Sequence, residues 1–201
     1  MHEHANPIDD LATVLTATAK LVAAVNRDQW SAATPCQEWN VRELVNHMVI
    51  GHRLFTGILR GEAAVTPGAL DPTSGDTLGD DPTATYQAAT EHLLTAFRRP
   101  GVLEQVFEVP AGTVPGSAAA HLRAVDELVH GWDLALATGQ HPRFPDDIVE
   151  RELEFTRLAL GQLPPGQSPF APAQPVADAA PPLDRLSALL GRSPGTTHAS
   201  D

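Results

Sequence analysis

The stretch from Ser117 to Gln140 constrains the fold most, because its pattern is that of one long amphipathic helix. Ser117 is a residue type that caps helix starts, and Gly139 suits the left-handed residue that often ends a helix. The apolar side chains recur every three or four residues, at Leu122, Val125, Val129, Trp132 and Leu136. This spacing predicts a helix that packs one face into a core.

A carboxylate and a histidine lie one turn apart within this stretch. Asp126 and His130 are four residues apart in the chain. On a helix that spacing brings two side chains onto one face, with their Cβ atoms about 5 to 6 Å apart. Both residue types bind divalent metal ions, so the pair predicts part of a metal site, and a third ligand has to come from elsewhere in the chain.

Three further periodic segments complete a predicted helical bundle. Apolar residues at helical spacing mark helices at about 8–25, 41–60 and 82–98. Asn40, followed three residues later by Glu43, resembles a capping box at the start of the second of these. Four long amphipathic helices predict an all-α bundle, and bundles often build metal sites between facing helices.

The remaining segments are predicted to be short or irregular. Residues 61–80 are rich in Gly, Pro, Asp and Thr and predict a long surface loop, of the kind that is often mobile or covers a site. Two short extended pieces around Ala111 and Gly112 predict a small hairpin. A fifth helix is expected from Pro145 to about Leu160. We expect a bundle domain at 1–162 and a proline-rich tail at 163–201, packed on the same domain, with one short helix at 183–190 and a disordered end.

His47 falls within an otherwise apolar stripe of the second predicted helix. A buried histidine needs a polar partner. Together with Asp126 and His130 it would give two imidazoles and one carboxylate, a set that suits zinc, iron or nickel and leaves a coordination position open. The residues alone equally allow a core histidine that is hydrogen-bonded to a carboxylate. His52 lies on another side of the same helix and is predicted to be exposed.

Composition excludes several classes of partner. The formal net charge is -12, and no basic cluster is present, which argues against nucleic acids and anionic membranes as partners. No apolar run approaches the roughly 18 residues of a membrane span, and the first residues lack the basic and apolar regions of a signal peptide. With Cys36 as the single cysteine, we expect a cytoplasmic protein without an internal disulfide.

Two segments resemble a known family. Residues 34–47, which end in His47, and residues 127–139 are similar to the DinB-like metal-binding proteins, in the branch of the N-terminal domain of mycothiol-dependent maleylpyruvate isomerase. The segment 169–192 is also similar to the tail of that branch. The resemblance implies a DinB-like four-helix bundle that holds a divalent metal, usually zinc, near one end.

The same resemblance implies the metal ligands. The family's first histidine falls on His47, and its acid and second histidine fall on Asp126 and His130. The characterised isomerase has glutamate at the acid position, so Asp126 is a departure, and the adjacent Glu127 is an alternative ligand. Arg123 could pair with either acid or meet a substrate carboxylate.

The other residues of these motifs have more than one interpretation. Asp133 could orient a ligand histidine, cap the chain or pair with an arginine. Glu43 could do the same for a ligand, although capping explains it equally well. Trp39 and Trp132 could touch a substrate but are expected to pack the bundle.

By this resemblance the chain is expected to be a thiol-dependent transferase or isomerase, with mycothiol or a related thiol as cosubstrate. The metal would activate the thiol, which then reacts with a small electrophilic substrate. The isomerase has a further C-terminal domain where this chain has its proline-rich tail, so maleylpyruvate itself is not the expected substrate. The alternative is a non-catalytic metal-binding or thiol-binding module. A homodimer is compatible with either function.

Overall fold

The computed structural model describes residues 6–36, 39–163 and 170–194. It divides into two compact units, within residues 1–142 and 143–201. Each unit is described by itself. The predicted boundary at residue 162, and the packing of the tail on the bundle, stay predictions.

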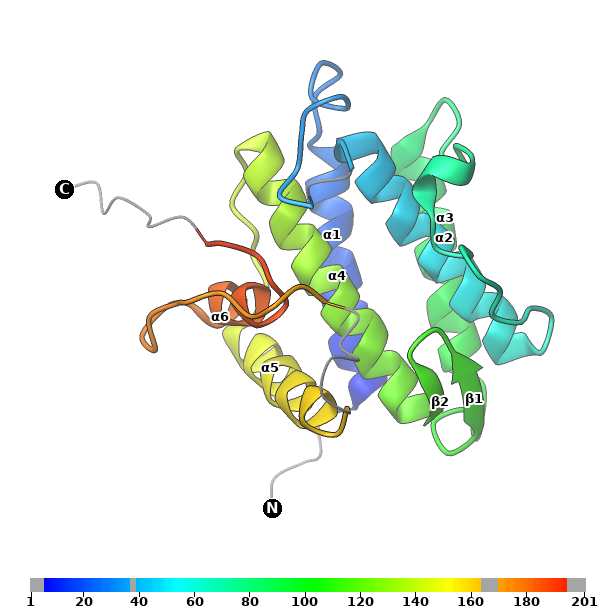
Figure 1. Cartoon of the computed structure of the whole chain (residues 1–201). Helices are drawn as coiled ribbons and strands as arrows, with labels where there is room; N and C mark the ends of the chain where they lie inside the picture. Colours follow the sequence, from blue (N-terminus) through cyan, green and yellow to red (C-terminus); the bar gives the residue numbers. More distant parts are fainter. Residues whose placement is uncertain (1–5, 37–38, 164–169, 195–201) are drawn as a thin grey trace. The chain divides into compact units, whose positions relative to one another are not determined.

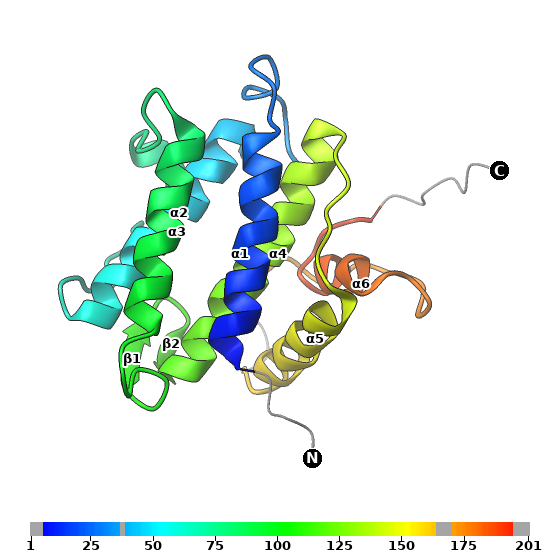
Figure 2. The ribbon, with the colours of Figure 1, turned by 180° about the vertical axis from the view of Figure 1, so that it is seen from behind.

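In the described part of the first unit, four long helices form a bundle. They are α1 (Pro7–Ala23), α2 (Val41–Arg60), α3 (Pro82–Phe97) and α4 (Gly116–Thr138). Helix α1 packs against α3 and α4, and α2 packs against the same two helices, as the two opposite views show (Figures 1 and 2). The helical bundle and its helix positions confirm the sequence-based prediction.

The start of α2 is fixed by the predicted capping box. The backbone N–H of Glu43 donates to Asn40 Oδ1 at 3.0 Å, and the backbone N–H of Asn40 donates to Glu43 Oε2 at 2.9 Å. Two N–H groups that the helix itself cannot satisfy are thereby paired. The capping interpretation of Glu43 is the one that the structure supports.

The end of α4 lies where the sequence predicted it, but its start does not. Gly139 has a φ of 68° and ends the helix as expected. Ser117 does not cap the start, because the helix begins one residue earlier and has no side-chain cap. The reason is that the neighbouring loop already supplies acceptors: the backbone N–H of Gly116 donates to Gln105 O at 2.8 Å, and that of Ser117 donates to Leu103 O at 3.0 Å.

The core of the first unit is built from the inner faces of the helices and from the loop and hairpin that precede α4. Leu136 was predicted to pack but is 58% exposed, because α4 buries Leu134, Ala135 and Thr138 near its end instead. The main buried cluster contains Ile8, Leu11, Leu15, Phe55, Ile58, Leu59, Leu93, Ala96, Phe97, Val102, Val109, Ala119, Ala120 and Ala124.

Two short elements connect the helices. The strands β1 (Val106–Val109) and β2 (Gly112–Pro115) pair antiparallel, with Val106 opposite Pro115, and confirm the predicted hairpin. The loop between α2 and α3 contains a single 3₁₀ turn, η1 (Pro72–Ser74). Both connections lie within the bundle unit, and the longer one reaches the site described below.

The second unit contains α5 (Asp146–Gly161) and α6 (Pro182–Leu189), which pack against each other and confirm the two predicted helices. Arg185 of α6 forms an ion pair with Glu150 of α5. The predicted disordered end lies largely outside the described residues. Among the described residues, no helix has both the length and the hydropathy to cross a membrane.

Candidate metal centre

Helices α2 and α4 bring His47, Asp126 and His130 close together. One ligand atom from each lies within 4.8 Å of the other two. Asp126 Oδ1 is 3.8 Å from His47 Nε2 and 3.6 Å from His130 Nε2. These separations are too long for direct hydrogen bonds but fall within the roughly 4 Å spanned by two ligands that are each about 2.0 to 2.2 Å from one ion.

The second ring nitrogen of each histidine is held by an acceptor. His47 Nδ1 lies 2.8 Å from the carbonyl oxygen of Leu70, and His130 Nδ1 lies 3.2 Å from Asp133 Oδ2. A carbonyl or carboxylate oxygen can only accept here, so Nδ1 carries the proton in both rings. In the neutral form of each ring the lone pair then lies on Nε2, which faces Asp126, as metal binding requires.

The loop that contains Leu70 is bound to α2 by Asn46, the residue before His47. Asn46 Nδ2 donates to the carbonyl oxygens of Pro72 at 2.9 Å and Gly75 at 2.7 Å. Its Oδ1 accepts from the backbone N–H and the hydroxyl of Thr77 at 3.0 and 2.7 Å. The loop predicted at 61–80 is thus tied to α2 beside the histidine.

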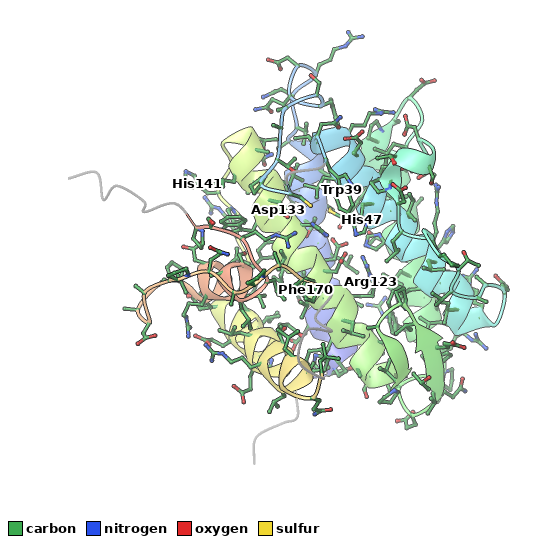
Figure 3. The ribbon with its side chains drawn as sticks, viewed as in Figure 1. Trp39, His47, Arg123, Asp133, His141 and Phe170 are labelled. Carbon is green, nitrogen blue, oxygen red and sulfur yellow. The ribbon has the colours of Figure 1, made fainter. Side chains whose placement is uncertain are left out.

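Trp39 lies against both histidines, in the loop that precedes α2. Its ring centroid is 4.5 Å from that of His47 and 5.9 Å from that of His130, and Figure 3 shows it beside His47. The two histidine rings are 4.9 Å apart and nearly perpendicular. From the sequence Trp39 was expected to pack the bundle rather than touch a substrate, and its contact with both histidines was not predicted. The signal was its position eight residues before His47, at the start of the helix that carries the ligand.

Asp126 is ionised at neutral pH by its surroundings. Burial alone would raise the pKa of this carboxyl, but the Arg123 guanidinium and then the two histidines outweigh that effect and hold the pKa well below its usual range. Arg123 Nη1 donates to Asp126 Oδ2 at 3.0 Å. The Asp126 side chain is 27% exposed, against 9% for each histidine, so solvent reaches the site at this carboxylate.

Glu127, the alternative acid, belongs to a different cluster. Its Oε1 is 2.7 Å from His52 Nε2 and accepts from Arg123 Nη2 at 3.1 Å, and its Oε2 accepts from the Tyr86 hydroxyl at 2.6 Å. Burial alone would raise its pKa, but His52, Arg123 and the Tyr86 hydroxyl lower it below the usual value. Both oxygens are occupied, and the structure places Asp126 rather than Glu127 beside the histidines.

The prediction that His52 is exposed was wrong, because its exposed fraction is 0%. Helix α2 buries two faces, one toward α4 and one toward α3, where the rings of His52 and Tyr86 meet with centroids 5.2 Å apart. A residue that lies off the first apolar stripe is therefore still inside the bundle. His52 is paired with a carboxylate there, which is how a buried imidazole is accommodated.

Comparison with known proteins finds the same family that residues 34–47 and 127–139 resemble. The model of the mycothiol maleylpyruvate isomerase N-terminal domain family matches residues 11–135, which include all three site residues. Two uncharacterized proteins from two strains of Mycobacterium tuberculosis, Rv0738 and MT0763, are each 35% identical over 178 residues, covering 88% of this chain and 92% of the relative.

The solved structures found by comparison share the fold. The crystal structure of the mycothiol-dependent maleylpyruvate isomerase matches with a TM-score of 0.62 at 17% identity, over 73% of this chain and 66% of that one. A histidine-to-alanine mutant of the same isomerase matches with a TM-score of 0.61 at 16% identity and the same coverage. The bundle is thus the DinB-like fold, and this chain spans just under two thirds of the isomerase.

Proposed function

Since the chain belongs to the mycothiol maleylpyruvate isomerase N-terminal domain family, we propose that it holds one divalent metal ion, zinc, on His47, Asp126 and His130. We further propose that the ion binds a small thiol, such as mycothiol, for transfer to an electrophilic small molecule. The observation that carries the proposal is the convergence of one ligand atom from each of the three residues within 4.8 Å, with Asp126 Oδ1 3.8 and 3.6 Å from the two Nε2 atoms.

The donor set fits a catalytic zinc site. Zinc takes histidine nitrogen and carboxylate oxygen at about 2.0 to 2.2 Å, and its catalytic sites have three protein ligands and one open position. Both imidazoles have an acceptor beside Nδ1, which leaves Nε2 as the atom for an ion, and the carboxylate is ionised. Iron and nickel accept the same donors and remain alternatives to zinc.

The chemistry that such an ion supplies is the binding of a thiol sulfur and the stabilisation of its deprotonated form near neutral pH. The chain's own residues contribute orientation and shielding. Leu70 and Asp133 fix the two rings, and the loop held by Asn46 lies beside His47. Trp39 lies against both histidine rings, and in this proposal it shields that side of the site from water.

A second candidate is a non-catalytic metal-binding or thiol-binding module. It is favoured by the fact that the polar side chains next to the ligands already have structural contacts. Asp133 faces His130, and Arg123 binds two carboxylates. The two candidates differ in one measurable property, which is turnover of an electrophile by the thiol-loaded protein.

Elemental analysis of the untagged protein tests the site. We expect about one metal ion per chain in the wild type and in the matched control His92→Ala, whose histidine is exposed on α3. We expect none in His47→Ala or His130→Ala, with helix content retained, because packing rather than the metal holds a bundle of this size. Full metal content in both ligand variants would contradict the placement.

Thiol chemistry is tested on the metal-loaded protein. Mycothiol and N-acetylcysteine are offered with a panel of electrophiles, and the rate is compared with that of chelator-treated protein. A rate above the metal-free control supports a transferase or isomerase. Tight thiol binding without turnover supports the module, and the absence of both would leave only the metal site.

A further inference from the structure

A buried guanidinium lies directly behind the proposed metal ligand Asp126. Arg123 Nη1 donates to Asp126 Oδ2 at 3.0 Å, and Arg123 Nη2 donates to Glu127 Oε1 at 3.1 Å. The Arg123 side chain is 3% exposed. Figure 3 shows it in the space between α2 and α4. Spacings of three and four residues on α4 let one arginine reach both acids.

The facing helix is shaped to admit this guanidinium. A Cβ atom added at Gly51 would lie 2.6 Å from Arg123 Nη1 and 3.1 Å from Arg123 Cζ, so any other residue would force the guanidinium to shift. The ring centroid of Phe55, one turn further along α2, is 5.2 Å from Arg123 Cζ. Glycine is unfavourable inside a helix compared with alanine, and its presence here is explained by the close approach of Arg123.

Glu127 holds the arginine from the other side. This carboxylate is fully buried and is itself held by His52 and by Tyr86. A buried charge that is paired and hydrogen-bonded keeps a fixed geometry, whereas an unpaired one is costly. Movement of Arg123 toward solvent would therefore cost the buried Glu127 one of its three hydrogen-bond partners.

The two oxygens of Asp126 have different neighbours. Oδ2 accepts from the guanidinium at 3.0 Å, and Oδ1 lies 3.8 and 3.6 Å from the two Nε2 atoms. A carboxylate with both oxygens free can bind an ion through both of them, which fills an additional coordination position. The engagement of both terminal nitrogens of Arg123 also favours this role over contact with a substrate carboxylate.

We infer that Arg123 is a positioning residue that restricts Asp126 to one metal-facing oxygen and so keeps a position open for an exogenous thiol. The inference rests on the proposed metal and thiol function and extends it to the residues behind the ligand. Gly51 contributes to the same restriction, because it provides the space that the guanidinium occupies.

The test uses cobalt as a spectroscopic substitute for zinc and N-acetylcysteine as the thiol probe. Three variants disturb the contact between Arg123 and Asp126 in different ways, and they are called the Arg123 variants. Gly51→Ala displaces the guanidinium without removing a charge, and Arg123→Met removes the guanidinium. Arg123→Met combined with Glu127→Gln removes both buried charges together. The matched controls are Gly161→Ala, where an added Cβ meets no atom within 4 Å, and Arg151→Met, which removes an exposed arginine paired with Asp147. Each protein is loaded with cobalt, its visible absorption is recorded, and the thiol is titrated.

We expect all five variants to retain about one cobalt per chain. In the three Arg123 variants the visible absorption of cobalt should weaken, because its coordination number rises when Asp126 binds through both oxygens. Their affinity for the thiol should fall by about tenfold or more. The two controls should match the wild type. If Arg123 had only a structural role, its loss would change thermal stability alone. Arg123 variants with the wild-type cobalt spectrum and thiol affinity would therefore overturn the inference.

The outcome also separates this inference from the proposed function. A wild type that binds no cobalt would overturn both. A wild type that binds cobalt but no thiol would contradict the thiol function, and the cobalt spectra of the variants would then decide the role of Arg123. If Arg123→Met does not fold, Gly51→Ala and the double variant still give the answer, because the first keeps the arginine and the second removes the buried charge of Glu127 together with it.

Discussion

The neighbouring acids Asp126 and Glu127 should respond to substitution in opposite ways. Asp126 faces the two metal-site histidines, whereas Glu127 is enclosed with His52 and Tyr86. We predict that Asp126→Asn abolishes stoichiometric metal binding with a small loss of stability. Glu127→Gln should keep the metal and lose much more stability.

The magnitudes follow from burial and from the number of partners. Glu127 has an exposed fraction of 0% and three hydrogen-bond partners, and the removal of one charge from a buried pair costs about 3 to 5 kcal/mol. For a chain of this size that corresponds to a fall in Tm of roughly 6 to 20 °C. Asp126 is 27% exposed, and Arg123 keeps Glu127 as a partner, so we expect about 1 kcal/mol for Asp126→Asn.

Urea unfolding followed by far-UV circular dichroism gives the free energy of unfolding, and elemental analysis gives the metal content. The metal-free form of each protein is used for the unfolding curves, so that bound metal does not add to stability. Glu62→Gln, an exposed acid just after α2, is the matched control and should stay within about 0.5 kcal/mol of the wild type. A Glu127→Gln protein within about 1 kcal/mol of the wild type would refute the stability reasoning, and loss of metal in Glu127→Gln but not in Asp126→Asn would show that the ligand is the other acid.

Three further outcomes are expected. Asn46→Ala should free the loop beside the metal site, because Asn46 holds it by four hydrogen bonds. Metal affinity in chelator competition should fall by about tenfold, and limited proteolysis of the loop should become faster. Unchanged affinity and proteolysis would show that other contacts hold the loop. Gly116→Ala would place a Cβ 2.0 Å from the carbonyl oxygen of Val102 and should cost about 1 to 3 kcal/mol in a thermal melt, unless the preceding loop can move. The folded pKa values of Asp126 and Glu127 lie below their unfolded values of about 3.9 and 4.3. The two carboxylates therefore stabilise the fold fully above the unfolded pKa values, and this stabilisation is lost as the pH falls toward and through the folded ones. Urea unfolding between about pH 6 and pH 3 should show a steeper loss of stability in the wild type than in Glu127→Gln.

Much of the site could be predicted because its contacts on α4 are local. Arg123, Asp126, His130 and Asp133 follow one another at spacings of three, four and three residues, so a helix alone brings each next to the following one. The pairing of Arg123 with the acids and the contact of Asp133 with His130 were among the interpretations that the spacing allowed. The structure selects them over the alternatives.

The contacts between helices could not be predicted in the same way. His52 was assigned to solvent because it lies off the first apolar stripe of α2. A second stripe was present, however, in Val45, Met48, His52, Phe55 and Leu59, which recur at spacings of three and four and are all buried. A helix with two such stripes is covered on two sides, and its polar residues on either stripe need partners inside the protein.

The sequence of α2 also carries the facing half of the site. His47, Gly51 and Phe55 recur every four residues, so they lie along one side of the helix, opposite the series on α4. The first contributes a nitrogen that faces Asp126, the second admits the guanidinium of Arg123, and the third lies against that guanidinium. Each of these residues is ordinary in isolation, and glycine is even unfavourable within a helix. Only the pairing of the two series, which depends on how the helices pack, explains why a histidine, a glycine and a phenylalanine occur in this order.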